Sequence, residues 1–214
     1  MFVTLSDDVV TLRPWSRDDA RFMAEACADP AIRRYNGILD RLGYPAPPPT
    51  ITDAEAVIDE FALAWRAFAT TGTPTGVAFA IIDARSGELV GCCGVDDWSK
   101  ADAAQFGYWL AASARGRGYA TRAVILLTRW LFDLGAARAF LTIVAGNDAS
   151  VAVARRAGFV HEGTMRAHSV WQGQRCDVMW FAALPLEWTM LGSAGRSRAA
   201  GPTPLDSLAT EGRG

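Results

Sequence analysis

The sequence has little of several features that mark particular classes of protein. The formal net charge of its 214 residues is only −2 at pH 7, which gives no basis for general binding to nucleic acid or to a membrane surface. No apolar run approaches the length of a membrane span, and no N-terminal segment combines basic residues, an apolar core and a cleavage site. We therefore expect a cytoplasmic protein with neither nucleic acid nor membrane as a partner.

Cysteine is also scarce. Cys27, Cys92, Cys93 and Cys176 show no spacing typical of metal ligands, so we expect no metal. The neighbouring Cys92 and Cys93 lie in an apolar stretch, where packing is a simpler interpretation than redox chemistry.

Half of the residues are hydrophobic and about a fifth are charged, which is typical of a globular chain with a substantial core. Hydrophobic periodicity and turn residues predict a mixed α/β domain over residues 1–190, followed by a C-terminal tail over 191–214 without periodicity. Strands are expected at 9–13, 77–83, 88–95, 106–111, 138–144, 159–171 and 175–186, and helices at 17–28, 53–72, 120–134 and 148–158.

The helix expected over 53–72 has its own start signal. Thr52 with Glu55 three residues later is the pattern of a capping box, and Gly72 is a suitable stop. Its broad apolar stripe predicts that one side is well buried; the stripe comprises Val57, Ile58, Phe61, Leu63, Trp65 and Phe68.

Residues 105–122 combine an apolar strand, a Gly-x-Gly loop and the start of a helix. Unpaired N–H groups and the helix dipole favour an anion at such a helix start. Gly116 and Gly118 allow unusual backbone angles, while Arg115, Arg117 and Arg122 supply positive charge. The loop is therefore a candidate phosphate cradle, although a plain flexible connection has the same pattern.

The spacing Arg115-x-x-Gly118-x-Ala120 resembles the Arg/Gln-x-x-Gly-x-Gly/Ala signature of the GNAT superfamily of N-acetyltransferases. The resemblance implies a GNAT fold with a mostly antiparallel sheet of about six or seven strands flanked by about four helices. It also implies acetyl-CoA as cofactor, with its pyrophosphate on the loop. The residues expected to bind it are Trp109, Leu110, Arg115, Gly116, Arg117, Gly118, Tyr119, Ala120, Thr121, Asn147 and Arg155.

A second pattern begins at Asn147. Asn-x-x-Ser, then Ala-Gly-Phe at 157–159, Glu162-Gly163 and Arg166 looks like the branch of GNATs that acetylates the N-termini of ribosomal proteins. In that branch the position of Ser150 serves as general acid toward the departing thiolate. The position of Asn147 contacts the pantetheine arm or bound water.

Each of these residues also has a structural interpretation. Asn147 suits the N-cap of a helix whatever its chemistry, and Arg166 with Asp177 suits an ion pair between the last two strands. Arg155 and Arg156 reach either an outer phosphate of the cofactor or solvent.

The general base is where the sequence departs from its relatives. Gln105 and Ser169 stand where many relatives carry glutamate. The remaining candidates are Asp96, Asp97, Glu162 and His168. Of these we select His168, because histidine is the side chain whose ordinary pKa lies closest to neutrality, although a lone histidine on a strand is often structural.

A site without a strong base favours an acceptor that is already neutral. At pH 7.5 an α-amine with a pKa near 7.8 is roughly one-third neutral, whereas a lysine amine is only about 0.1% neutral. We expect the acceptor site between the two N-terminal helices, their proline-rich link and the last hairpin, with Pro45–Pro49 as a lid. Aromatic residues that could line it are Tyr35, Tyr44, Trp65, Trp98 and Trp171.

The sequence thus predicts an acetyl-CoA-dependent N-acetyltransferase acting on a protein N-terminus or a small-molecule amine, as a monomer or homodimer. Serine and asparagine at 150 and 147 favour this interpretation. The alternative is a catalytically inactive acyl-CoA-binding sensor or interaction module, which the missing carboxylates at 105 and 169 favour.

Overall fold

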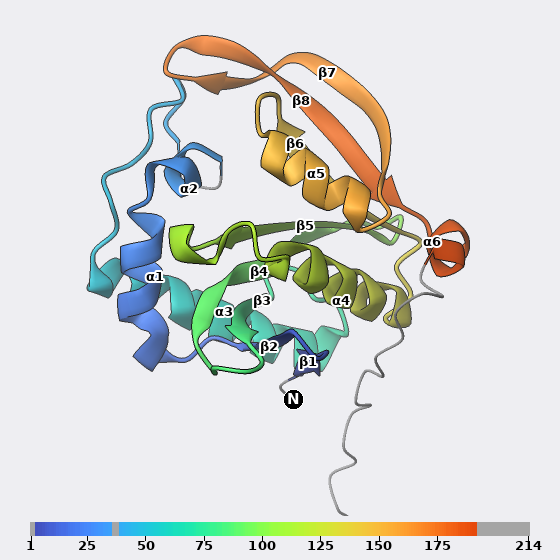
Figure 1. Cartoon of the computed structure of the whole chain (residues 1–214), viewed down its shortest axis with the longest axis horizontal. Helices are drawn as coiled ribbons and strands as arrows, with labels where there is room; N and C mark the ends of the chain where they lie inside the picture. The colour runs from blue at the N-terminus through green and yellow to red at the C-terminus, as the bar shows by residue number, and fades with distance from the viewer. Residues whose placement is uncertain (1–2, 36–38, 192–214) are drawn as a thin grey trace, which may run out of the picture.

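A computed structural model describes residues 3–35 and 39–191, which form one sheet with helices on both faces (Figure 1). The strands are β1 (Leu5–Ser6), β2 (Val10–Pro14), β3 (Ala78–Asp83), β4 (Leu89–Trp98), β5 (Ala103–Leu110), β6 (Arg138–Val144), β7 (Val160–Trp171) and β8 (Gln174–Ala183). The helices are α1 (Ala20–Cys27), α2 (Pro30–Tyr35), α3 (Ile51–Thr71), α4 (Tyr119–Asp133), α5 (Asp148–Arg156) and α6 (Pro185–Leu191). Most of the tail expected over 191–214 lies outside the described residues.

The strands follow the order β1-β2-β3-β4-β5-β6-β8-β7, and within the described part of the chain β5 and β6 are the one parallel pair. That pairing is short, because it joins Ala103–Gln105 to Arg138–Phe140 and stops there. Beyond Gln105 the two strands diverge toward the loops that follow them. We call this line of divergence the seam.

Two apolar cores cover the two faces of the sheet. One joins α4 and α5 to the sheet through residues such as Val124, Leu127 and Phe106. The other packs α1 and the first half of α3 on β3 and β4. Figure 1 shows α4 and α5 on the near face and α3 behind the sheet, with the long β7–β8 hairpin above.

Several local predictions need correction. Thr50, not Thr52, caps α3, and its capping box uses Asp53. Leu63 is 59% exposed, because it lies two residues from Phe61 and therefore turns away from the buried side of the helix. Ten residues form β4, which continues through a β-bulge to Trp98.

The structure contains β1, α2 and α6, which the expected element boundaries did not include, so the described residues hold eight strands and six α-helices. The first is a two-residue strand, and the two helices have only six and seven residues. Such short elements carry little periodicity. The mixed, mostly antiparallel architecture itself is as expected.

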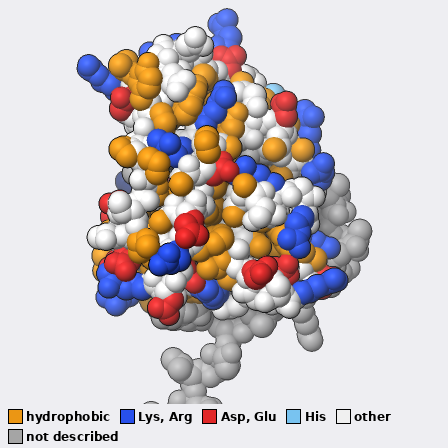
Figure 2. All heavy atoms as spheres, turned by 60° about the vertical axis from the view of Figure 1, so that its left-hand side comes forward, with side chains coloured by type: hydrophobic (Ala, Val, Ile, Leu, Met, Phe, Trp, Pro, Cys, Tyr) orange, Lys and Arg blue, Asp and Glu red, His pale blue; other side chains and the backbone are white. Residues whose placement is uncertain are grey.

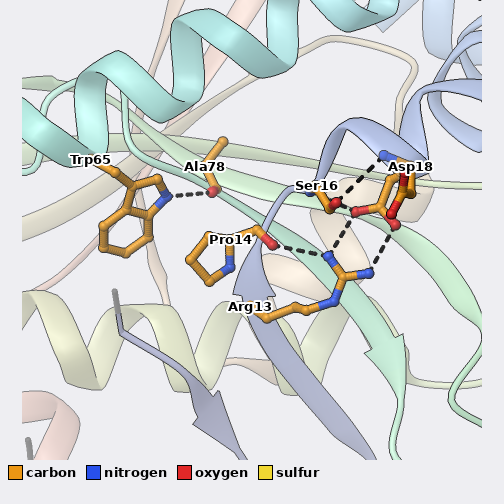
Figure 3. A network of polar contacts seen from close by, with 7 residues as sticks. Arg13, Pro14, Ser16, Asp18, Trp65 and Ala78 are labelled. Carbon is orange, nitrogen blue, oxygen red and sulfur yellow. Dashed lines mark hydrogen bonds and ion pairs between the residues drawn. The ribbon is translucent and has the colours of Figure 1, made fainter. Parts of the chain in front are cut away.

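A polar network fixes the first helices to the sheet. Arg13 on β2 donates to the Pro14 carbonyl and to both carboxylate oxygens of Asp19, at 2.7 and 2.9 Å (Figure 3). Burial raises the pKa of Asp19, but hydrogen bonds from Arg13 and Ser16 outweigh it, and the net pKa is lowered. In the same view Trp65 of α3 donates to the Ala78 carbonyl at 3.1 Å. These contacts fix the start of α1 to β2 and fix α3 to β3.

Candidate active site

The glycine loop opens one cavity beside the seam. This loop cavity has a volume of about 580 Å³ and lies between the end of β5, the N-terminus of α4 and the helix α5. Of the residues expected to bind the cofactor, those that line it are Trp109, Leu110, Arg115, Gly116, Gly118, Ala120, Thr121 and Asn147.

The two glycines shape the loop through their backbone angles. Gly116 and Gly118 have φ of 75° and 86°, a region that other residues rarely adopt, and Gly118 is the N-cap of α4. A Cβ at either position would meet no atom within 4 Å. Glycine is therefore required here for conformation rather than for space, and it leaves the first N–H groups of α4 accessible from the cavity.

The arginines of the loop are less available to bind an anion than the sequence suggested. Arg117 pairs with Asp83 at 3.7 Å and lies over the Tyr119 ring, while Arg122 pairs with Asp7 at 3.5 Å. The Tyr119 hydroxyl itself donates to Asp83 and lowers the pKa of that carboxyl. The side chains of Arg117, Tyr119 and Arg122 do not line the loop cavity.

Arg115 does line the loop cavity, and it joins two elements there. Its guanidinium donates to the Leu110 carbonyl at 3.2 Å and pairs with Asp29 at 3.2 Å. The Asp29 carboxylate in turn accepts the Ala31 N–H at the start of α2. On α5, Arg156 rather than the expected Arg155 faces the cavity, because neighbouring helical residues point about 100° apart.

A second cavity lies where β5 and β6 diverge. This strand cavity has a volume of about 420 Å³, and β7 and β8 contribute to its wall. Gln105, His168 and Ser169 all line it, so the positions where relatives carry glutamate do face one space. Among the described residues, its lining contains no aspartate or glutamate.

The two cavities meet at four side chains: Tyr35, Tyr108, Asn147 and Ser150. Asn147 accepts the Ser150 N–H at 3.2 Å, so it caps α5 as its structural interpretation predicted and also faces both cavities. The Tyr35 hydroxyl donates to the Gly146 carbonyl at 3.4 Å. Sequence reasoning missed Tyr108, whose only signal was its position on the strand that enters the loop.

A bulge in β7 directs His168 toward the strand cavity. Between Met165 and Ser169 the strand carries more residues than its partner, and Ala167 there has φ of 54°. Asp177 on β8 accepts the Ala167 N–H at 2.8 Å. The ion pair expected between Arg166 and Asp177 is therefore wrong, and Asp177 instead holds a backbone conformation that costs about 1–2 kcal/mol for alanine.

The other candidates for the general base lie elsewhere. Glu162 pairs with Arg138, at 2.9 Å for one of its two contacts. Asp96 occupies the bulge of β4, where desolvation raises its pKa to about 6 even though its side chain reaches solvent. Neither Asp96, Asp97 nor Glu162 lines the loop cavity or the strand cavity.

Of the five aromatic residues expected at the acceptor site, Tyr35 alone lines either cavity. Trp65 is buried in the core against Phe79, and Trp171 lies under Arg34. Apolar spacing did not distinguish core aromatics from those at the site.

The link between α2 and α3 is attached to the tip of the last hairpin. The N–H of Gln172 donates to the Gly43 carbonyl at 3.1 Å, and a Cβ at Gly43 would lie 2.3 Å from the Val170 carbonyl oxygen. The prolines that follow, Pro45, Pro47 and Pro49, cover neither of the two cavities but a third, mostly apolar one of about 350 Å³ between α1 and α3. The prolines predicted as a lid thus lie over this third cavity and not over the strand cavity.

Comparisons with known proteins agree with this geometry. A model of the acetyltransferase (GNAT) domain matches residues 10–160. YdaF of Bacillus subtilis (strain 168), described as a candidate ribosomal N-acetyltransferase, is 34% identical over 86 residues. That match covers 40% of this chain and 47% of YdaF, so the chain spans about half the length of this curated relative.

Solved structures extend the likeness to most of the chain. A GCN5-related N-acetyltransferase from Brucella melitensis has a TM-score of 0.67 at 25% identity, covering 88% of this chain and 81% of that one. RimL, a ribosomal L7/L12 alpha-N-protein acetyltransferase solved with coenzyme A, has a TM-score of 0.68 at 21% identity, covering 86% and 98%.

The fold class and the family expected from the sequence are thus confirmed. Two counts need correction: the described residues form a sheet of eight strands rather than about six or seven, and six α-helices rather than about four. Enzymes of this family use acetyl-CoA, in agreement with the coenzyme A bound to RimL. The chain belongs to the GNAT family of acetyltransferases.

Proposed function

We propose that the protein transfers the acetyl group of acetyl-CoA to a primary amine by direct attack in a ternary complex. The observation that carries this proposal is the meeting of the loop cavity and the strand cavity at Tyr35, Tyr108, Asn147 and Ser150. A donor held on the glycine loop and an amine in the strand cavity would reach one another there. Such placement supplies much of the rate acceleration in a two-substrate reaction.

The reaction forms a C–N bond and breaks the C–S bond of the thioester. Developing negative charge on the carbonyl oxygen needs N–H donors. Because the Ala111 N–H donates to Val90 of β4, alternation along β5 directs the N–H of Leu110, rather than that of Trp109, toward the seam. Ser150 gives its proton to the departing sulfur.

His168 takes the proton that the amine loses. It lines the strand cavity, whereas Asp96, Asp97 and Glu162 do not. Its position depends on the β7 bulge that Asp177 holds.

The acceptor that suits this site is a protein N-terminal α-amine. Among the described residues the strand cavity holds His168 but no carboxylate as a base. An α-amine is neutral in a much larger fraction than a lysine amine at pH 7.5, so it depends less on this weak base. The face shown in Figure 2 mixes acidic, basic and apolar side chains. The names of YdaF and RimL, which refer to ribosomal proteins, agree with such an acceptor.

The test is chromatographic measurement of coenzyme A released from acetyl-CoA with a panel of amines. The decisive pair is a peptide with a free N-terminal Ala or Ser and the same peptide with a blocked N-terminus and an internal lysine. We expect turnover with the first, slowed about 10²-fold by Ser150→Ala. Ser86→Ala, a serine in the β3–β4 turn, is the matched control and should leave the rate unchanged. Faster transfer to lysine would contradict the proposed acceptor.

The second candidate is a non-catalytic acyl-CoA-binding module, which Gln105 and Ser169 favour. Calorimetry separates the two functions. Binding of acetyl-CoA without coenzyme A release for any amine would support the module and contradict the enzyme.

A further inference from the structure

Ser150 is a weak acid for the task that the proposed function gives it. An aliphatic hydroxyl loses its proton about as reluctantly as water, whose pKa is 15.7. A thiolate leaving next to Ser150 would gain a proton only if the serine oxygen were resupplied at the same time. A second acidic hydroxyl behind Ser150 would do this.

Tyr108 occupies that place. It lies on β5 and packs toward the core that includes α4 and α5, and it lines both the loop cavity and the strand cavity, as Ser150 does. Burial raises the pKa of Tyr108 to about 12, and hydrogen bonding with Ser150 opposes this rise. Even with this raised pKa, the phenol is a far stronger acid than a serine hydroxyl. That value is still about four units below the pKa of water.

The other side chains at the junction are engaged differently. Asn147 uses its Oδ1 to accept the Ser150 N–H, and the Tyr35 hydroxyl donates to the Gly146 carbonyl. His168 lines only the strand cavity. Tyr108 is therefore the acidic hydroxyl at this junction that is available to the Ser150 side chain, with which it lines both cavities.

We propose that Tyr108 is a positioning residue of the acetyl transfer, which turns the Ser150 hydroxyl toward the thioester sulfur and resupplies its proton. This inference rests on the proposed function. As the C–S bond breaks, the sulfur forms an S–H bond with the proton of Ser150. The Ser150 oxygen takes the proton of Tyr108, and the phenolate left behind accepts a hydrogen bond from Ser150. Solvent returns a proton to Tyr108 and removes the one that His168 took from the amine, so the overall reaction is balanced.

The experiment compares wild type, Tyr108→Phe, Ser150→Ala and the double variant with one acceptor peptide. We expect Tyr108→Phe to lower kcat about 10- to 100-fold while the KM for acetyl-CoA changes less than about two-fold. Since the two hydroxyls act as one unit, the kcat of the double variant should lie at most about two- to three-fold below the kcat of Ser150→Ala alone. Thr128→Val removes a buried hydroxyl of α4 away from both cavities and is the control; its kcat should equal that of wild type.

The outcomes separate the two proposals. If wild type releases no coenzyme A with any acceptor, the proposed function is wrong, and the role of Tyr108 is overturned with it. If wild type is active and Tyr108→Phe keeps a kcat within two-fold, the role of Tyr108 alone is overturned. The same holds if the losses from the two single variants multiply in the double variant, or if Tyr108→Phe raises KM and leaves kcat unchanged.

Discussion

At the scale of single residues, the conformation of Ala167 determines where His168 points. An alanine at φ of 54° is held by a hydrogen bond from its N–H to Asp177 at 2.8 Å, and its carbonyl accepts a longer one from Arg175 at 3.5 Å. We expect Asp177→Ala to lower kcat/KM for the amine about five-fold, since one such bond contributes roughly 1 kcal/mol and its loss frees the bulge. The affinity for coenzyme A, measured by calorimetry, should not change.

Asp177→Asn is the matched control for this variant, because its amide oxygen can still accept the N–H. It should retain most of the activity. Equal losses in Asp177→Ala and Asp177→Asn would show that the charge of Asp177 matters rather than its hold on Ala167.

A second prediction concerns thiol reactivity. Burial raises the pKa of Cys27 to about 11, so at pH 8 only about 0.1% of this thiol is ionised. Because the thiolate is the reactive form, alkylation of Cys27 by iodoacetamide should rise about ten-fold per pH unit between pH 8 and 10. Mass spectrometry of the Cys27 peptide measures this rate, and the half-exposed Cys176 is the internal comparison. A Cys27 rate that is flat over this range would contradict the buried environment.

Local spacing in the sequence was enough to bring several candidate residues to the wall of one cavity. Asn147, Ser150 and the two glycines of the loop fall where their local spacing placed them. The availability of the loop arginines for an anion was predicted poorly. Asp83 and Asp7, which pair with Arg117 and Arg122, lie far away in the sequence. Tyr108 escaped notice for the same reason, since its neighbour Ser150 is 42 positions further along the chain.

At the scale of elements, one glycine attaches the α2–α3 link to the β7–β8 hairpin. Gly43 combines φ of 77° with a close approach to the Val170 carbonyl. We expect Gly43→Ala to destabilise the protein by more than the 1–2 kcal/mol of a left-handed alanine, because the link must also move away from the hairpin. Urea unfolding measures this loss. Kinetics should show a raised KM for the amine with an unchanged KM for acetyl-CoA.

Gly87→Ala separates the two effects of that substitution. Gly87 has a similar φ of 75°, but a Cβ there would meet nothing within 4 Å. This variant should lose about 1–2 kcal/mol of stability and no activity. If both variants lower the free energy of unfolding by the same amount, the close approach of Gly43 to the hairpin does not contribute to stability.

Element type was predictable from periodicity, whereas element ends were less so. The start of α3 illustrates the limit: Thr50-x-x-Asp53 and Thr52-x-x-Glu55 both have the pattern of a capping box, and the structure uses the earlier one directly after Pro49. The helix α6 was missed because a strand was expected to continue through Leu186, where the chain instead turns at Pro185. Local pattern alone does not decide between such alternatives.

At the scale of the whole molecule, the proposed binding of coenzyme A in the loop cavity predicts that the cofactor stabilises the folded state, because the unfolded chain has no such cavity. At a concentration 100-fold above Kd, coenzyme A should add about 2.7 kcal/mol to the free energy of unfolding. For a chain of this length that corresponds to a rise in Tm of roughly 5–10 °C. Thermal unfolding followed by circular dichroism measures it.

Arg115→Ala should reduce this rise, since Arg115 is the loop arginine that lines the cavity. Ser86→Ala should leave it unchanged. A Tm that does not respond to coenzyme A at millimolar concentration would contradict the assignment of the loop cavity to the cofactor.

The global fold was predictable because the order of strands and helices is distinctive, even with several ends misplaced. The cavities were not, because their walls come from elements distant in sequence. Ile32 of α2 and Trp109 of β5 line both the loop cavity and the apolar cavity under the prolines. No spacing along the chain indicates such a shared wall.

The seam lies at the centre of the sheet. β1–β5 lie on one side of it and β6–β8 on the other, and the two sides share only three residue pairs between β5 and β6 in the described sheet. Tyr108 belongs to the first side, while Ser150 and His168 belong to the second. A small rotation about this line would change the spacing of the two hydroxyls while each half kept its internal structure. The proposed pair of hydroxyls is thus assembled across the seam, with one side chain supplied by each side of the sheet.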